Sequence, residues 1–446
     1  MSARSPRVFR ANENRGGQMT DAVTAGGRPA PRVRLGETTS AFLDLARGLA
    51  ASLVVLAHTR LVFDLPWPIQ ELGGYCVVVF FLLSGMLIFT SLLNHLRSGE
   101  ERFADFLADR IARIFTPLVP VLVLAVLANF FLIDGRWGQR GVNEGVAAFF
   151  GNLFLLNDYP LFQAASKFVN VWPYYVRSYN AAEPLWTVAI EFWIYVVAGL
   201  FAFLVVARQR VNWLTAAIAA GLALPVFVWN LFAGGGSGLS LTWMIGAAFG
   251  ALWAAMAGRE YSRRFFASLL VVGALGVAGK MLDKSNLAYS TQTATFMAMM
   301  LFGFAFSVDI KGVSLFVLKK VAHFFSSYSY SLYLVHNIVL VVVFESKIAT
   351  LVPSYVLAII AAHLVASVIY FLFERHHKKV SKAIRPALQY LLQRPARKFA
   401  ETAPGAIGAM EALDENRNTA LAGADPGGDD ALGAARRPGE RLEAGI

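Results

Sequence analysis

The stretch FLDLARGLAASLVVLAHTRLVF, residues 42–63, is long and apolar enough to cross a bilayer, yet it carries ionisable side chains. Asp44, Arg47 and His58 each cost free energy in hydrocarbon, roughly 3 kcal/mol for an Asp or Arg at a helix centre. A helix turns about 100° and rises about 1.5 Å per residue, so His58 returns to within ~20° of the face of Arg47, ~16 Å further along. Asp44 lies ~40° from the same line. The stretch therefore predicts a spanning helix whose single polar stripe is turned away from lipid.

The composition places the whole chain in the membrane class. Of its 446 residues 57% are hydrophobic and only 15% are charged, and the mean hydropathy is +0.53. A soluble protein of this length carries more charge, so we expect an all-α polytopic membrane protein. The net charge of +11 is then assigned to basic cytoplasmic loops rather than to a nucleic-acid partner. The single cysteine, Cys76, excludes an internal disulfide and a cysteine-rich metal site, and no metal is expected.

Ten apolar runs have spanning length. They are residues 42–63, 72–93, 114–133, 184–207, 212–232, 239–257, 264–282, 288–308, 324–346 and 352–373. With the N-terminus inside, the basic connections fall on the cytoplasmic side, whereas the short connections 64–71 and 233–238 carry no basic residue. The positive-inside rule is then obeyed only if residues 145–162 do not cross the membrane. We therefore expect about ten transmembrane helices with both termini cytoplasmic, and a re-entrant or interfacial segment within an outer excursion, 134–183.

The ends of the chain differ from its middle in composition. Residues 1–40 are polar, basic and rich in Gly, Pro and Ala, which predicts a disordered tail. Residues 41–376 hold the spans, and residues 377–446 are first basic and then rich in Ala, Gly, Asp and Glu, which predicts a cytoplasmic tail. The predicted location is the inner (plasma) membrane, with many passes. The sequence leaves the oligomeric state open.

Two ionisable residues on different spans share a predicted depth. His58 lies ~8 Å below the outer boundary of its outward-running helix, and Glu191 lies ~10 Å below the same boundary of an inward-running one. A carboxylate beside an imidazole fixes its tautomer and supports a general base that deprotonates a hydroxyl. A structural buried pair that joins two helices is the alternative interpretation.

Three arginines share the cytoplasmic side. Arg110 and Arg113, in FADFLADRIARIFTPLVP, are spaced i,i+3 and so lie on one helix face. Together with Arg47 they are suited to a basic pocket for a phosphate-bearing ligand. The alternative is that they are membrane anchors paired with Asp105 and Asp109.

Other polar and aromatic groups allow two interpretations each. Ser84 and Gly85, in VVVFFLLSGMLIF, indicate a close helix contact, although a serine nucleophile fits as well. Tyr333 and His336 follow Ser329 on one face of their helix, as a channel lining or as interhelical hydrogen-bonding groups. Trp172, in the aromatic segment KFVNVWPYYVRSYNAAEPLW, suits either an interfacial belt or stacking on a sugar face.

Taken together, these segments resemble the acyltransferase 3 family of integral membrane acyltransferases. LDLARGLAASLVVLAH resembles its first-helix signature of an Arg and, after ten residues, a His. YCVVVFFLLSGMLI resembles its FF-x-x-SG block, RIAR its third-helix Arg pair, PLWTVAIEFWIYVV its LWS-x-x-VE-x-x-FY element, and SYSLYLVH its late-helix block. The segments occur in the family's order over residues 42–375. The chain departs from the family at Val78 and Val79, where many members carry an acid, and it lacks the fused esterase-like domain of some members.

The resemblance implies transfer of an acyl group, usually acetyl, from cytoplasmic acyl-CoA to a hydroxyl of an exported or surface glycan or glycolipid. It implies His58 as the catalytic base, Glu191 as a support of the reaction centre, and Arg47, Arg110 and Arg113 on the CoA side. From the residues themselves we expect the substrate contacts to be Ser84, Tyr333, His336 and Trp172. The rival functions are a transporter or channel that uses the same polar stripe, and a non-catalytic scaffold. No internal repeat is visible in the sequence, which weighs against a transporter built from inverted halves.

Overall fold

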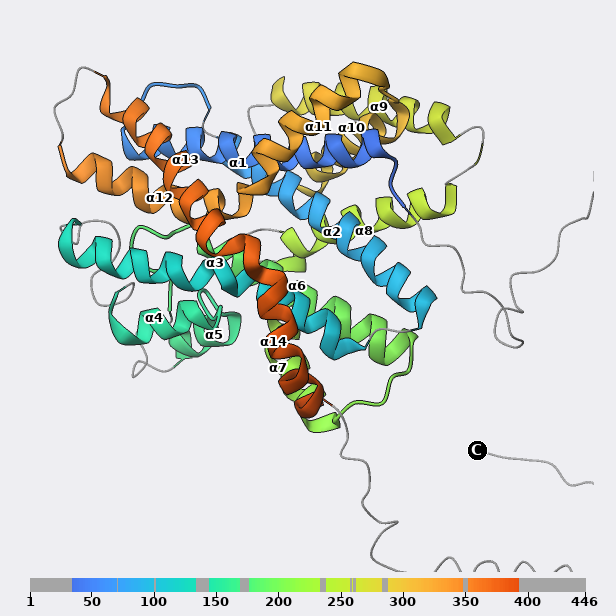
Figure 1. The fold of residues 1–446 in the computed structure, drawn as a ribbon, viewed down its shortest axis with the longest axis horizontal. Helices are drawn as coiled ribbons and strands as arrows, with labels where there is room; N and C mark the ends of the chain where they lie inside the picture. Colours follow the sequence, from blue (N-terminus) through green and yellow to red (C-terminus); the bar gives the residue numbers. More distant parts are fainter. Residues whose placement is uncertain are drawn as a thin grey trace, which may run out of the picture. The chain divides into compact units, whose positions relative to one another are not determined.

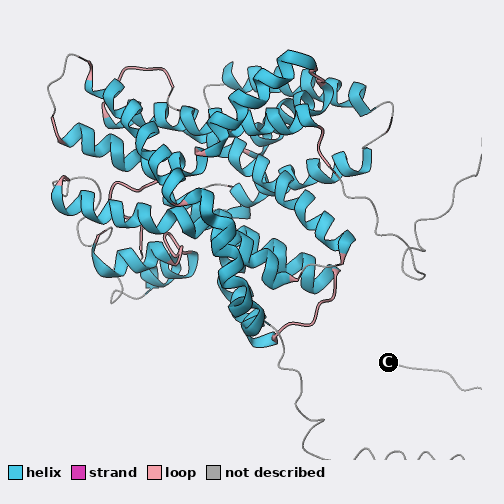
Figure 2. Cartoon of the chain, in the orientation of Figure 1, coloured by secondary structure: helices cyan, strands magenta, loops and turns pink. Residues whose placement is uncertain are grey.

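The computed structural model describes residues 34–69, 71–99, 102–133, 144–168, 176–232, 238–256, 259, 262–282, 288–347 and 352–392. All the regular elements in these ranges are helices (Figures 1 and 2). In chain order they are α1 (Glu37–Val62), α2 (Leu72–Ser98), α3 (Phe103–Phe131), α4 (Gly145–Leu153), α5 (Pro160–Phe168), α6 (Leu185–Leu200) with the π-helical turn η1 (Phe201–Val206), α7 (Trp213–Phe232), α8 (Leu239–Met256), α9 (Ser262–Leu282), α10 (Thr291–Ser307), α11 (Gly312–Ser327), α12 (Ser329–Glu345), α13 (Ser354–Leu372), η2 (Glu374–His376) and α14 (His377–Leu392).

The predicted all-α membrane class is confirmed. Within the described ranges, eight helices are long and apolar enough to cross a membrane, and nine if the bent pair α11–α12 is one span. The predicted span 288–308 corresponds to α10, which has 17 residues. The protein is therefore a multi-pass membrane protein.

The predicted span 324–346 is not one straight helix. The chain bends by 47° between α11 and α12, next to a run of serines. Ser327 Oγ donates to the carbonyl of Phe324 (3.0 Å) and Ser329 Oγ to that of Ser326 (2.8 Å). Hydroxyls that bond to nearby carbonyls compete with the helical ladder. A basic stretch that the charge pattern assigned to a connection is thus the helix α11.

The first part of the predicted tail beyond residue 377 is also helical, and α14 packs along α3 (Figure 1). Gln389 donates to Asp105 (2.8 Å), Arg385 approaches the same carboxylate at 3.3 Å, and Ser381 donates to Asp109. The two aspartates therefore bind α14. The structure therefore does not support the alternative interpretation, in which these aspartates pair with Arg110 and Arg113.

The segment 145–162 forms short helices instead of a span. α4 and α5 have nine residues each, or ~14 Å of helix, about half the thickness of the hydrocarbon core. This agrees with the prediction that the segment does not cross as one helix.

The close helix contact predicted at Ser84–Gly85 is confirmed, and α8 is the partner. A Cβ added to Gly85 would lie 2.0 Å from the carbonyl oxygen of Trp243, and one added to Gly246 would lie 2.1 Å from that of Leu82. The backbones of α2 and α8 therefore touch. The helix α1 packs against α2, α11 and α12, and α3 packs against α6 and α12. These contacts bring the polar faces of α1, α2, α3, α6 and α12 together.

Candidate active site

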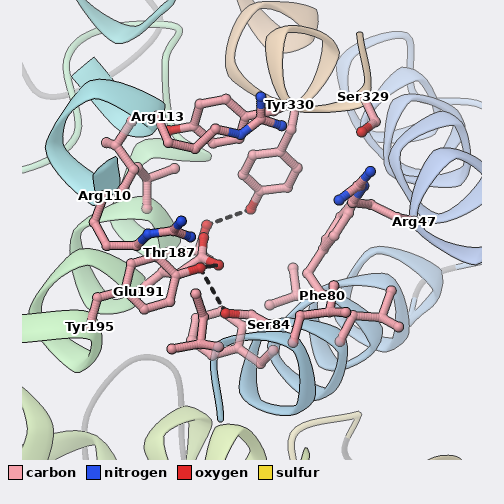
Figure 3. Close-up of a pocket in the computed structure, with 18 residues that line it drawn as sticks. Arg47, Phe80, Ser84, Arg110, Arg113, Thr187, Glu191, Tyr195, Ser329 and Tyr330 are labelled. Atoms are coloured by element: carbon pink, nitrogen blue, oxygen red, sulfur yellow. Dashed lines mark hydrogen bonds between the residues drawn. The ribbon is translucent and has the colours of Figure 1, made fainter. Parts of the chain in front are cut away.

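The five helices enclose a cavity of about 170 Å³, which we call the arginine cavity. It is lined by Arg47, Val77, Phe80, Phe81, Leu83, Ser84, Leu87, Ile88, Arg110, Arg113, Ile114, Thr187, Val188, Glu191, Tyr195, Ser329, Tyr330 and Tyr333. Arg47 enters from α1, opposite Arg110 and Arg113 from α3, and Glu191 and Ser84 lie between them (Figure 3). The three arginines that the sequence placed on one side thus face one cavity.

Two of these guanidinium groups keep unused hydrogen-bond donors. The Nε atoms of Arg47 and Arg110 are buried and have no hydrogen-bond partner among the described residues. Nη2 of Arg47 forms an ion pair with Asp44 at 2.8 Å. The Arg110 guanidinium lies over the rings of Phe106 and Tyr195, at 5.7 and 6.0 Å from the ring centroids. A buried donor without a partner costs free energy, so the arrangement suits an anionic ligand.

Arg113 has a carboxylate partner that the sequence analysis missed. Its Nη1 lies 2.9 Å from Oε1 of Glu374, whose side chain is fully buried. The other oxygen of Glu374 accepts from the backbone N–H (3.1 Å) and the hydroxyl (2.6 Å) of Ser331. Glu374 therefore fixes Arg113 against α12. The sequence offered one sign of this ion pair, the single acidic residue before the basic residues in ERHHKK. The charge pattern used that run only to place a cytoplasmic connection.

Glu191 ends a chain of hydrogen bonds. Trp243 Nε1 donates to Ser84 Oγ (3.2 Å), the hydroxyls of Ser84 and Tyr195 are 2.8 Å apart, and the Tyr195 hydroxyl donates to Glu191. Tyr195 has one hydroxyl proton, which goes to the carboxylate, so Ser84 donates its own proton to Tyr195. Ser84 is therefore an orienting group in this arrangement, and no histidine activates it as a nucleophile.

His58 opens into a second, smaller cavity, the histidine cavity, of about 80 Å³. It is lined by His58, Leu61, Val62, Ala181, Glu183 and Asn337. The ring partner of His58 is His336, which is fully buried, with His336 Nε2 at 3.2 Å from His58 Nδ1. The structure thus brings His58 and His336 together from α1 and α12.

The carbonyl groups around the two rings fix their tautomers. His336 Nδ1 lies 3.1 Å from the carbonyl oxygen of Leu332 and 2.9 Å from that of Tyr333, and His58 Nδ1 lies 3.1 Å from that of Val54. Carbonyl oxygens only accept, so Nδ1 carries the proton in each neutral ring. The Nδ1 proton of His58 is then shared between two acceptors, the Val54 carbonyl oxygen and His336 Nε2, and the lone pair of His58 is on Nε2. A general base needs this form.

The predicted pairing of His58 with Glu191 is not found. Glu191 is bonded to Tyr195 and lines the arginine cavity, whereas His58 is bonded to Val54 and His336 and lines the histidine cavity. Equal depth along two helices leaves their rotation undetermined, and Glu191 faces α2 and α3 instead of His58. Trp172 lies outside the described residues.

A third cavity, of about 270 Å³, lies on the opposite face of α6 and is called the tryptophan cavity. Trp186, Trp193 and Trp229 line it together with Asn157 and Asn230. The side-chain oxygens of both asparagines are buried, and no described residue donates a hydrogen bond to them. Aromatic faces beside free acceptors suit a ligand that carries hydroxyl groups. Burial raises the pKa of the neighbouring Asp158 carboxyl.

Comparison with known proteins gives a match along most of the membrane domain. The family model described as an acyltransferase domain, acyltransferase 3, matches residues 40–371. An O-acetyl transferase of Shigella phage Sf6 is 28% identical over 161 residues, which are 35% of this chain and 44% of the phage protein. The chain thus aligns with less than half of that relative. No solved structure matches.

Proposed function

Since the chain belongs to the acyltransferase 3 family, we propose that it moves an acyl group, with acetyl as the first candidate, from acyl-CoA to a hydroxyl of an exported or cell-surface saccharide. The observation that carries the proposal is the pair of cavities joined by α1. Arginines with unpartnered buried donors lie at one end of the polar stripe, and a histidine with its lone pair on Nε2 lies at the other. Eleven residues of helix, ~16 Å, separate them.

The proposed roles follow from this arrangement. Arg47, Arg110 and Arg113 bind the phosphate groups of acyl-CoA from the cytoplasmic side of the inner membrane. The pantetheine arm extends along α1 toward His58, and His58 Nε2 takes the proton of the acceptor hydroxyl. The phage relative is described as an O-acetyl transferase, which supports a hydroxyl acceptor and an acetyl donor. The tryptophan cavity supports a saccharide acceptor, since tryptophan faces stack on sugar rings.

The test compares two donors that differ in their phosphates. Purified protein in proteoliposomes receives acetyl-CoA or acetyl-pantetheine together with the surface polysaccharide of the host cell, and thiol release and polysaccharide acetylation are followed. A charged hydrogen bond contributes about 1.5–3 kcal/mol, so Arg110→Gln should raise KM for acetyl-CoA roughly 10- to 150-fold. The same variant should leave KM for acetyl-pantetheine nearly unchanged.

Arg263→Gln is the matched control, because Arg263 is 64% exposed and pairs only loosely with Asp309 at 3.4 Å. It should change neither constant. Equal effects of Arg110→Gln on both donors would contradict the phosphate role. Turnover of acetyl-CoA without acetylation of the polysaccharide would contradict the proposal that a saccharide is the acceptor. Solute counterflow without turnover would favour the transporter alternative.

A further inference from the structure

The arginine cavity and the histidine cavity are separate, and one layer of side chains divides them. On α12, Tyr333 lines the arginine cavity and Asn337 lines the histidine cavity. On the chain entering α6, Thr187 lines the first and Glu183 the second. On α12 four residues of helix rise ~6 Å, so the division there is about one helical turn thick. Glu183 lies in the turn before α6, two residues ahead of its first residue. A thioester that enters among the arginines meets Tyr333 and Thr187 before it reaches His58.

A short hydrogen bond closes this layer, and its direction can be assigned. The hydroxyls of Thr187 and Tyr333 are 2.5 Å apart, and both side chains are buried. Thr187 Oγ1 also donates to the carbonyl oxygen of Pro184 at 2.9 Å. A threonine hydroxyl has one proton, and that proton is used on Pro184. Tyr333 must therefore donate, and Thr187 accepts.

The direction of this bond distinguishes the two hydroxyls when a substrate carbonyl takes the place of Thr187. The Tyr333 hydroxyl can redirect its hydrogen bond from Thr187 Oγ1 to another acceptor in the same place, so that no buried donor is left unpaired. Thr187 cannot do so, because its proton stays on Pro184. The rings of Tyr333 and Phe80 pack in a T-shaped pair, with ring centroids 5.3 Å apart. His336 is bonded to the Tyr333 carbonyl, so the donor and the partner of the base lie on one turn of α12.

We infer that the Tyr333 hydroxyl is the catalytic hydrogen-bond donor to the thioester carbonyl, an oxyanion donor that rests on Thr187 when no substrate is present. The inference rests on the proposed acyl transfer. His58 Nε2 takes the proton of the acceptor hydroxyl as its oxygen attacks the carbonyl carbon. The π electrons of the carbonyl move to its oxygen, and Tyr333 stabilises that charge. Collapse re-forms the carbonyl and breaks the C–S bond, and the thiolate takes the proton from His58. The products are an ester and a free thiol.

The test removes the same hydrogen bond from either end. Loss of one oxyanion donor costs about 10²–10³ in kcat, so Tyr333→Phe should lower kcat by that factor with KM for acetyl-CoA nearly constant. Thr187→Val removes the resting acceptor and not the donor, and its kcat should fall by less than about fivefold, a loss of ~1 kcal/mol. Thermal midpoints of both variants are measured alongside.

Equal losses of kcat in the two variants would overturn the inference, because a merely structural bond is lost equally from both ends. Full activity of Tyr333→Phe would also overturn it. If Tyr333→Phe fails to insert, 3-fluorotyrosine at position 333 replaces it, and this stronger donor should keep or raise kcat. A fall at unchanged stability would count against the donor role. Wild-type protein that releases no thiol from acetyl-CoA would instead refute the proposed function itself.

Discussion

Substitution of Gly85 by alanine tests the contact that holds Ser84 and Trp243 in place. The added Cβ would lie 2.0 Å from the carbonyl oxygen of Trp243 and 3.0 Å from the backbone nitrogen of Ala247, whereas ordinary contacts are 3.4–4 Å. Both neighbours are backbone atoms, so no side chain can rotate away. The helix α8 must therefore move by more than ~1 Å.

The cost can be worked out from the contacts that this movement breaks. Overpacking costs about 1–3 kcal/mol, and loss of the Trp243–Ser84 hydrogen bond adds about 1 kcal/mol. The better helix propensity of alanine returns about 0.5–1 kcal/mol. The net destabilisation is then roughly 1–3.5 kcal/mol. With about 2.1 cal/mol/K of unfolding entropy per residue, this lowers the thermal midpoint by ~1–4 °C for a chain of this size.

The assay is thermal unfolding of the purified protein in detergent at one fixed scan rate. Gly221→Ala in α7 is the matched control, because nothing lies within 4 Å of its added Cβ. It should unfold at the wild-type temperature or slightly above. If Gly85→Ala unfolds together with Gly221→Ala, α2 and α8 do not approach as closely as described and the reasoning fails.

Three further predictions concern the base, the buried carboxylate and the topology. His58→Gln keeps a hydrogen-bonding side chain but cannot take a proton, so acyl transfer per inserted protein should fall about 10²–10⁴-fold; substantial transfer would make this histidine structural. Glu374→Gln turns an amide toward the Arg113 guanidinium and should cost roughly 1.5–3 kcal/mol, read as a lower thermal midpoint; an unchanged midpoint would show that the ion pair contributes nothing. In a background without the native cysteine, Glu71→Cys should react with an impermeant thiol reagent from outside and Lys311→Cys only after permeabilisation; the reverse pattern would invert the predicted topology.

The membrane class and the polar stripe of α1 were predictable because both depend on local properties of the chain. The count was predicted less well, since ten spans were expected and eight or nine of the described helices are long and apolar enough. Apolar length predicts a span, and helical geometry predicts that Arg47 and His58 share a face. The contact at Gly85 was predictable for the same reason, since a small residue within an apolar run indicates a close approach. The break at Tyr328 was missed, because the serines around it lower the helical preference without interrupting the apolar pattern.

The partners of the site residues were not predictable in the same way. Depth and charge suggested Glu191 for His58, but the rotation of α6 about its axis depends on what packs around it. Tyr195, which is itself bonded to Ser84, donates to Glu191, and His336 is bonded to His58. Glu374 escaped notice because it lies between the predicted span that contains α13 and the helix α14, which the composition had assigned to a tail.

The neutral partner of His58 has a consequence for the proposed reaction. A carboxylate beside a catalytic histidine stabilises the imidazolium that forms when the ring takes a proton. His336 accepts from His58 as a neutral ring, because its other nitrogen is committed to two carbonyl oxygens. It orients His58 without supplying a formal negative charge. In the proposed reaction the departing thiolate is the group that removes the proton taken from the acceptor hydroxyl. Proton abstraction and departure of the thiol then belong to one turnover at one ring nitrogen.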